Sequence, residues 1–259
     1  MATGMMQGRR AAIFGVANDH SIAWAIAQRF HGEGATLALT YPNAAIEKRV
    51  RPLAESLGVE LVLPCDVSDD AQIADVFATL GERWGDGLDA VVHSVAFAAR
   101  EDLKGRFIET SRHGFHLALD VSAYSLVAVA RAAEALLAAR RGSLVTMTYY
   151  GAEKVFPHYN VMGIAKAALE ASMRYLAADL GPAGIRVNAI SAGPLRTLSA
   201  AGINGFREML HHHEARAPLR RNITADEVAA AALYLCSDAA TAVTGEVLHV
   251  DGGYNITGM

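Results

Sequence analysis

Tyr159 and Lys166 lie seven positions apart, a spacing that predicts a shared catalytic site. Seven residues make about two turns of a helix, so both side chains are expected on one helix face. Such a lysine can hold the hydroxyls of a nicotinamide ribose and lower the proton affinity of the phenol, which donates to a developing oxyanion. A second phenol, Tyr149, ends the preceding apolar run and is expected to face the same pocket. The pattern favours hydride chemistry.

The loop at residues 15–22 joins a short apolar run to the first stretch of helical periodicity. A glycine at such a turn, here Gly15, lets the backbone approach a pyrophosphate, and the first N–H groups of the helix face it. Ser21 is expected to cap that helix. The three-glycine fingerprint of dinucleotide-binding folds is absent, so an ordinary turn glycine stays an alternative for Gly15.

Two further strand ends bear on the cofactor. Asp66 follows the apolar run 61–64 and can accept from an adenine amino group, although a helix cap is an equally compatible role. Residues 40–43, Thr-Tyr-Pro-Asn, end the preceding strand without the carboxylate that would hold an adenosine ribose. The choice between NADH and NADPH is therefore open.

Short apolar runs alternate along the chain with longer stretches of helical periodicity, which predicts parallel βαβ units. The runs are continuous, as is typical of strands covered by helices on both faces. The expected strands are 11–14, 36–41, 61–64, 88–95, 143–148, 186–191 and 247–250. The expected helices are 21–31, 44–57, 71–84, 113–139, 159–179 and 225–235. We predict a single α/β domain over residues 1–259, built on a doubly wound, parallel seven-stranded Rossmann-like sheet.

Residues 194–215 interrupt this alternation and are expected to cover the substrate. The stretch 193–213 has no clear period, and a long aperiodic segment inside a compact domain is typical of a lid. Its three adjacent histidines, 211–213, do not indicate a metal site, because adjacent helical residues point to different sides. We expect them on a solvated face of the lid.

Composition excludes several other classes of protein. Hydrophobic residues make up 52% and charged residues 19%, which argues against disorder. The 23 basic and 27 acidic residues give a net charge of −4, and the scattered basic residues argue against nucleic-acid binding. Two cysteines, Cys65 and Cys236, favour a reducing compartment over a disulfide framework. Without a secretory signal or a membrane span, a cytoplasmic protein is expected.

Seven segments distributed over almost the whole chain form a specific combination. They are 15–22, 65–67, 93–98, 149–153, 159–166, 186–198 and 245–253. Together they resemble the enoyl-acyl-carrier-protein reductases of bacterial fatty acid synthesis, the divergent NADH-using branch of the short-chain dehydrogenase/reductase family. The resemblance implies hydride transfer from NADH, with NADPH not excluded, to the β-carbon of a trans-2-enoyl thioester on acyl carrier protein. It also implies a homotetramer and no metal.

The resemblance assigns roles residue by residue. Tyr159 would lie near the thioester carbonyl, with Tyr149 as the second active-site tyrosine. Lys166 would bind the nicotinamide ribose, and Ala98 would touch the substrate. The dinucleotide site would comprise Gly15, Ser21, Ile22, Asp66, Val67, Ser94, Val95, Lys166, Leu195, Arg196, Thr197, Leu198 and Ser199.

Two alternatives compete with this function. A carbonyl or hydroxyl oxidoreductase of the main short-chain branch would carry Tyr-x-x-x-Lys, which places its tyrosine at the position of Met162. A catalytically silent dinucleotide-binding protein would not need Tyr149, Tyr159 and Lys166 together.

The expected docking rim for the carrier protein is weaker here than in several relatives. Those relatives present a basic cluster on the lid helix, whereas this chain keeps Arg207 and has Asn204 and Glu208 nearby. Arg220 and Arg221 could either join that rim or pair locally on a turn. We expect a modest electrostatic attraction to an acidic partner.

Overall fold

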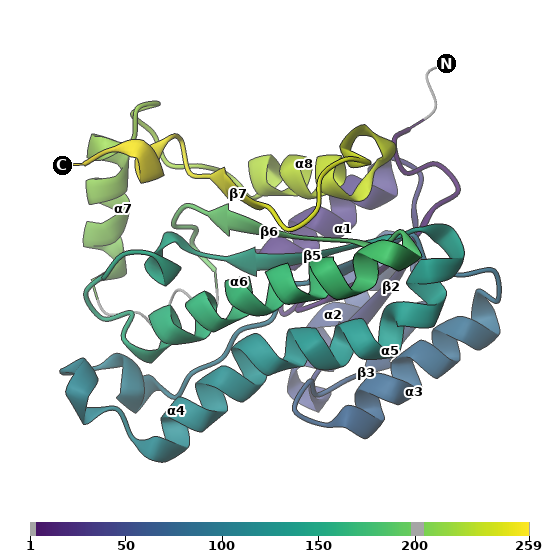
Figure 1. The fold of residues 1–259 in the computed structure, drawn as a ribbon, viewed down its shortest axis with the longest axis horizontal. Coiled ribbons are helices and arrows are strands. Elements are labelled where there is room, and N and C mark those ends of the chain that lie inside the picture. Colours follow the sequence, from purple (N-terminus) through teal and green to yellow (C-terminus); the bar gives the residue numbers. More distant parts are fainter. Residues whose placement is uncertain (1–3, 198–204, 259) are drawn as a thin grey trace.

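Seven parallel strands form the central sheet of the computed structural model, which describes residues 4–197 and 205–258 (Figure 1). The strands are β1 (Arg10–Phe14), β2 (Thr36–Tyr41), β3 (Leu61–Pro64), β4 (Ala90–His93), β5 (Ser143–Thr148), β6 (Arg186–Ala192) and β7 (Val247–Val250). Their order is β3-β2-β1-β4-β5-β6-β7, with every neighbouring pair parallel. The chain runs outward from β1 to β3 and then returns to β4 on the other side of β1. The predicted doubly wound sheet is confirmed, with its switch point between β1 and β4.

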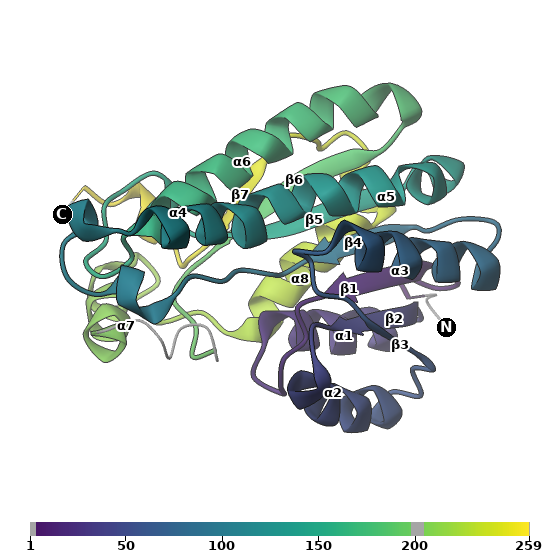
Figure 2. The same cartoon turned by 90° about the horizontal axis from the view of Figure 1, so that it is seen from below.

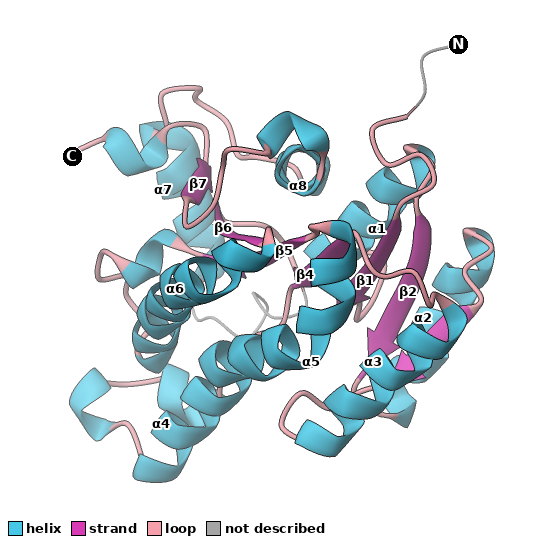
Figure 3. Cartoon of the chain, turned by 45° about the vertical axis from the view of Figure 1, so that its right-hand side comes forward, coloured by secondary structure: helices cyan, strands magenta, loops and turns pink. Residues whose placement is uncertain are grey.

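Helices cover both faces of this sheet, which explains why its strands are continuous apolar runs. The helices are α1 (Ile22–Gly32), α2 (Ala44–Ser56), α3 (Asp70–Arg83), α4 (Arg112–Leu119), α5 (Ser125–Arg140), α6 (Val161–Leu180), α7 (Phe206–Arg216) and α8 (Ala225–Cys236). α1, α2 and α8 share one hydrophobic cluster with the sheet, whereas α3, α5 and α6 share the other (Figure 2). Figure 3 shows the strands in magenta between these helix layers.

The strand expected at 88–95 is shorter in the structure. It starts later because the first two residues of the expected range make hydrogen bonds outside the β-sheet pairing. The Leu88 N–H donates to the Leu136 carbonyl of α5 at 3.0 Å, and the Asp89 carboxylate accepts from the Arg10 N–H at 2.9 Å. β4 therefore begins at Ala90.

The helix expected at 113–139 is interrupted by a π-helical segment, Asp120–Tyr124, between α4 and α5. This wide turn brings the Ser122 hydroxyl to the Phe97 backbone, accepting from its N–H at 2.9 Å and donating to its carbonyl at 3.0 Å. The whole stretch Arg112–Arg140 is long and apolar enough to cross a membrane by length and composition. Half of its most apolar window is buried inside the protein, and α5 packs against β4, β5, α3 and α6, as a core helix does.

The sequence pattern did not predict α7, because this stretch has no apolar period. Only Leu210 and His213 of its 11 residues are buried, so the helix has no broad apolar stripe. It lies beyond the carboxyl ends of the strands, near the C-terminus and apart from the two covering layers (Figure 1). Helical backbone thus extends through part of the segment that we expected to be aperiodic.

Candidate active site

A cavity of about 430 Å³ lies where β1, β4, β5 and β6 end. This is the position at which open α/β sheets bind ligands. The expected site residues that line it are Gly15, Ser21, Ile22, Ser94, Val95, Ala98, Tyr149, Tyr159, Lys166, Leu195 and Thr197. The structure therefore brings residues from the whole length of the chain into one cleft.

Gly15 is required by the close approach of two strand ends. Its φ is +102°, and a Cβ at this position would lie 2.1 Å from the Ser94 carbonyl oxygen. Any other residue would collide with the backbone beyond β4 and be strained in this conformation. The glycine is thus more than an ordinary turn residue, because it lets β1 and β4 meet at the floor of the cleft.

Ser21 occupies the N-cap position of α1 without capping the helix through its side chain, so that expectation was wrong. Its hydroxyl turns back into the loop, donating to the Asn18 carbonyl at 2.6 Å and approaching the Ala17 N–H at 3.4 Å. The first N–H groups of a helix have no intrahelical partner. Without a side-chain cap, the start of α1 keeps donors available to an anion at the cleft.

Tyr159 does not lie on the helix that carries Lys166, as the seven-residue spacing had suggested. It belongs to the turn before α6, which begins at Val161, and Asn160 at the N-cap has a φ of +40°. The turn still directs Tyr159 into the cavity, with 8% of the residue exposed. Tyr159 and Lys166 therefore line the same cavity, as expected, but an irregular turn and not a common helix face brings Tyr159 there.

The electrostatics of the pair also differ from the expectation. Burial, followed by the negative charge of Glu170, raises the pKa of Tyr159. Burial lowers the pKa of Lys166 to about 8, and its ammonium donates to the Met147 carbonyl at 2.7 Å. The lysine therefore does not lower the pKa of the phenol in this state. Tyr159 is protonated at neutral pH and available as a hydrogen-bond donor.

Tyr149 lies in an aromatic cluster beside Tyr159. Its ring centroid is 5.0 Å from that of Tyr159 and 5.0 Å from that of Phe156. Burial raises its pKa, and its hydroxyl lies 3.5 Å from the Met209 sulfur of α7. The second tyrosine thus connects the turn that carries Tyr159 with α7.

Several expected cofactor residues lie outside this cavity. Asp66 and Val67 do not line it, and the Asp66 carboxylate accepts from the Ser68 N–H at 3.0 Å and the Ser68 hydroxyl at 2.7 Å. The cap of α3 is Asp69, so Asp66 is not a helix cap. Arg196 lines a separate cavity of about 360 Å³.

The remaining expected residues, Leu198 and Ser199, fall outside the described part of the chain.

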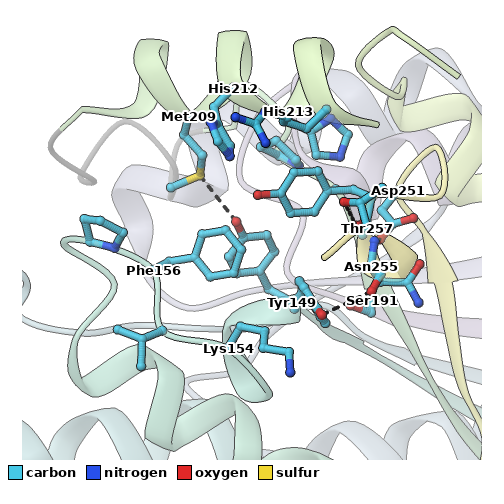
Figure 4. Close-up of a pocket in the computed structure, with 18 of the residues that line it drawn as sticks. Tyr149, Lys154, Phe156, Ser191, Met209, His212, His213, Asp251, Asn255 and Thr257 are labelled. Atoms are coloured by element: carbon cyan, nitrogen blue, oxygen red, sulfur yellow. Dashed lines mark hydrogen bonds between the residues drawn. The ribbon is translucent and has the colours of Figure 1, made fainter. Parts of the chain in front are cut away.

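A second, larger cavity of about 1120 Å³ adjoins the first. Figure 4 shows Met209, His212 and His213 entering it from α7, opposite Tyr149 and Phe156. The two cavities share the walls Tyr149, Ala192, Gly193, Pro194 and Met209. The cavity space therefore continues from the turn that carries Tyr159 toward the C-terminal segment.

The solvated face expected for the histidines was wrong for His213, which is 3% exposed. Its ring stacks on Tyr254 with centroids 4.8 Å apart, and burial lowers its pKa. A Cβ on Gly193 would lie 3.0 Å from its Nε2. His213 therefore packs between α7, the turn after β6 and the C-terminal segment.

Among the described residues, no group of three or more His, Cys, Asp or Glu is arranged to hold a metal ion.

Sequence reasoning missed several residues of the cleft, because most of them are apolar side chains whose type does not indicate a chemical role. Those not assigned to the site are Ala17, Phe97, Arg100, Leu103, Met147, Thr148 and Ala192, whereas Pro194, Phe206 and Met209 belong to the segment 194–215 that was expected to cover the substrate. His93 was also missed as a buried polar residue. Its ring nitrogens contact the Thr146 and Ser125 hydroxyls at 2.9 and 2.8 Å, and burial lowers its pKa to about 3. The sequence did offer one signal for His93, because a histidine at the end of an apolar run indicates a buried polar side chain.

Comparison with known proteins gives one consistent family. The family described as enoyl-(acyl carrier protein) reductase matches residues 15–255. A Rhizobium meliloti (strain 1021) protein named enoyl-acyl-carrier-protein reductase (NADH) 1 is 54% identical, covering 100% of this chain and 94% of that protein.

Two solved structures have the same fold over nearly their whole length. The Anaplasma phagocytophilum reductase in complex with NAD is 52% identical, with a TM-score of 0.95 over 100% of this chain and 98% of that chain. The Bacillus cereus reductase with NADP+ and indole naphthyridinone is 51% identical, with a TM-score of 0.96 over 99% of this chain and 100% of that chain.

Proposed function

The chain belongs to the enoyl-(acyl carrier protein) reductase family, and we propose how its cleft performs the reaction of that family. The protein is an oxidoreductase that transfers hydride from NADH to the β-carbon of trans-2-enoyl thioesters in fatty acid synthesis, with acyl carrier protein as the carrier of the substrate. One observation supports the assignment of its catalytic residues. Tyr149, Tyr159 and Lys166 line a single cavity at the carboxyl ends of the strands.

The residues of the cleft fit a dinucleotide. Gly15 lets the ends of β1 and β4 meet at the floor of the cleft, and the uncapped start of α1 supplies N–H donors suited to a pyrophosphate. Ser21 and Ile22 belong to this phosphate end. The buried Lys166 ammonium lines the same cavity and suits ribose hydroxyls. When bound, the dinucleotide supplies the hydride.

The two ends of the dinucleotide are assigned by position along the strand ends. Ser94 and Val95 line the cavity beside Lys166 and belong to the nicotinamide end. Asp66 and Val67, after β3, belong to the adenine end, where the Asp66 carboxylate would accept from the amino group. Leu195 and Thr197 line the cleft, and the segment that contains them would close over the bound molecule.

Tyr159 performs the electrostatic step. Its phenol is protonated because burial raises its pKa, so it can donate to the thioester oxygen as negative charge develops there. Loss of one such donor typically costs about 3 kcal/mol of transition-state stabilisation. Protonation of the α-carbon then completes the reduction. Tyr149 and Ala98 form the wall against which the acyl group lies.

Residues 194–215 cover the substrate. Pro194, Leu195 and Thr197 contribute to the cleft from one end of this segment, and Phe206 and Met209 contribute from the other. Apolar side chains on both sides of the site exclude water, which strengthens the hydrogen bond from Tyr159.

The carbonyl or hydroxyl oxidoreductase is disfavoured by the residue at position 162. Met162 lines the cleft, 7% exposed, where the main short-chain branch places its phenol. A thioether has no proton to donate. The substrate of the other branch would therefore meet no donor at this position.

A spectrophotometric assay tests the function directly. NADH and NADPH oxidation is followed with crotonyl and longer trans-2-enoyl thioesters, and a simple ketone serves as the competing substrate. Reduction of the enoyl thioesters without ketone reduction is expected. Turnover of the ketone alone would support the main-branch alternative.

The reductase is further proposed to be a cytoplasmic homotetramer. Native mass spectrometry tests the assembly, and a mass corresponding to a monomer at physiological concentration would contradict it. Fractionation of cells, with activity measured in each fraction, tests the location.

A further inference from the structure

Two side chains on one face of α6 tie that helix to the last two residues of β5. Lys166 Nζ donates to the Met147 carbonyl at 2.7 Å, and Thr148 Oγ1 donates to Glu170 Oε1 at 2.7 Å. Lys166 and Glu170 are four residues apart and therefore lie one above the other on the helix. Tyr149 follows Thr148 directly, so both ties end where the second active-site tyrosine begins.

Glu170 is a buried carboxyl group one helical turn from the buried Lys166 ammonium, and no hydrogen bond or ion pair joins the two groups among the described residues. The two residues are 6% and 5% exposed, respectively. Burial lowers the pKa of Lys166 to about 8, and the charge of Glu170 acts in the opposite direction. Burial raises the pKa of Glu170, while the hydrogen bond from Thr148 favours its charged form. Lys166 therefore depends on Glu170 for part of its charge near neutral pH.

Three other charged groups face Glu170. Glu153, which follows the 3₁₀ helix η4 (Tyr150–Ala152), raises its pKa, whereas Arg174 of α6 and His249 of β7 lower it. Glu153 and His249 pair with each other at 3.3 Å, and 45% of the Glu153 side chain is exposed. Within residues 4–197 and 205–258, Glu170 is the charged group that opposes the effect of burial on the pKa of Lys166.

We propose that Glu170 is a positioning residue of this reductase, held by Thr148 one helical turn from Lys166 so that its carboxylate keeps the lysine in the ammonium form that donates to Met147. Glu170 is absent from the described lining of the catalytic cavity, so it acts through the lysine and not on the ligand. The inference rests on the proposed function, in which Lys166 binds the ribose of the cofactor. A purely structural tie between α6 and β5 is the competing explanation.

Substitution of Glu170 by glutamine separates the two explanations. Gln keeps the shape and can still accept from Thr148, but it removes the charge. The measurement is NADH affinity by fluorescence titration between pH 6 and pH 10, with thermal unfolding followed in parallel. Because Lys166 loses the group that raises its pKa, the decline of affinity at alkaline pH should begin about one pH unit lower in Glu170→Gln. Affinity at pH 8 should fall about fivefold, and affinity at pH 6 should stay close to that of wild type.

Matched variants complete the test. Glu153→Gln removes an exposed carboxylate from the same neighbourhood and should leave the pH profile unchanged. Glu170→Asp keeps the charge and should restore most of the wild-type profile. An unchanged profile in a folded Glu170→Gln protein with lowered thermal stability would overturn the proposal and leave the structural tie.

Thr148→Val keeps the proposal testable if Glu170→Gln does not fold. Removal of the donor disfavours the ionised Glu170, so a smaller shift of the NADH profile in the same direction is expected, and no shift would overturn the inference. Wild-type turnover of an enoyl thioester is measured separately. Failure there would contradict the proposed function, whereas NADH affinity reports on Glu170 and Lys166 alone.

Discussion

The rings of Tyr149 and Tyr159 meet edge to face, with centroids 5.0 Å apart and an interplanar angle of 71°. Tyr149 follows the last residue of β5, and Tyr159 precedes α6. Each ring thus helps to fix the other, and neither phenol depends on a helix face for its orientation. Phe156 supports Tyr149 from the loop between them, with ring centroids also 5.0 Å apart. Substitution of either tyrosine by phenylalanine therefore removes the hydroxyl and keeps the contact between the two rings.

Tyr159→Phe should lower kcat by tenfold or more and leave NADH affinity nearly unchanged. The variant keeps the contact with Tyr149 and removes only the donor to the developing oxyanion, an effect of about 1.4 kcal/mol or more. Steady-state kinetics with an enoyl thioester and fluorescence titration with NADH check both parts. Wild-type turnover would assign the oxyanion to another donor.

Lys166→Ala should weaken NADH binding markedly, and Lys166→Arg should retain part of it. The ammonium is buried in the cleft, and arginine keeps its charge but not its compact shape. Isothermal titration calorimetry on all three proteins measures the difference. Equal affinity of the alanine variant and wild type would show that the lysine serves only to hold the Met147 carbonyl.

The protein should lose stability as the pH falls below about 6.5, in part because of His93. Its pKa is lowered to about 3 by burial, so between these values the unfolded chain binds a proton that the folded chain does not. The unfolded state is then favoured by up to about 1.4 kcal/mol per pH unit. Urea unfolding at pH 7, 6 and 5 measures the slope. His93→Asn should show a shallower slope, and an identical slope would assign the acid sensitivity to other groups.

NADH should be preferred over NADPH. The guanidinium of Arg51 is already paired with Glu47 at 2.6 Å and lies over the Tyr41 ring at 5.8 Å, so it is not free for a 2′-phosphate. Lys48 and Arg49 are exposed on the same helix and keep NADPH use possible. Values of kcat/KM for the two cofactors decide the question, and a preference for NADPH above about tenfold would reject this prediction.

A matched variant tests the reason for that preference. Glu47→Gln should release Arg51 and raise kcat/KM for NADPH severalfold, with NADH nearly unaffected. An equal effect on both cofactors would point to a disturbed α2 instead.

Arg207→Glu should raise KM for enoyl-acyl-carrier protein and spare a small enoyl thioester. Arg207 is exposed on α7, whereas Arg221 pairs with Glu227 at 2.9 Å and Arg220 donates to the Ala215 carbonyl. The local pairing left open for Arg220 and Arg221 is therefore confirmed, and Arg207 is an exposed basic group at the start of α7. A carrier protein with an acidic surface would lose attraction, and the loss should shrink with added salt. Equal losses on both substrates would assign Arg207 to folding or closure of the covering segment.

The sequence by itself determined the fold class and the identity of the chemical groups. Continuous apolar runs in a chain of alternating periodicity predict a covered parallel sheet, and glycine, serine and tyrosine at their ends mark the ligand edge. Strand bounds at 36–41, 61–64, 143–148 and 247–250 follow from these runs, because turn residues or helical periodicity limit both ends.

Only the tertiary structure decided how those groups are held. The spacing of Tyr159 and Lys166 suggested a common helix face, but the tyrosine reaches the cleft through a turn in which Asn160 has a positive φ. The tie between Thr148 and Glu170 joins residues 22 positions apart in the chain, and no periodicity predicts it. Burial lowers the pKa of Lys166. The sequence could not predict this shift, because burial depends on the surrounding layers of the protein and not on neighbouring residues in the sequence.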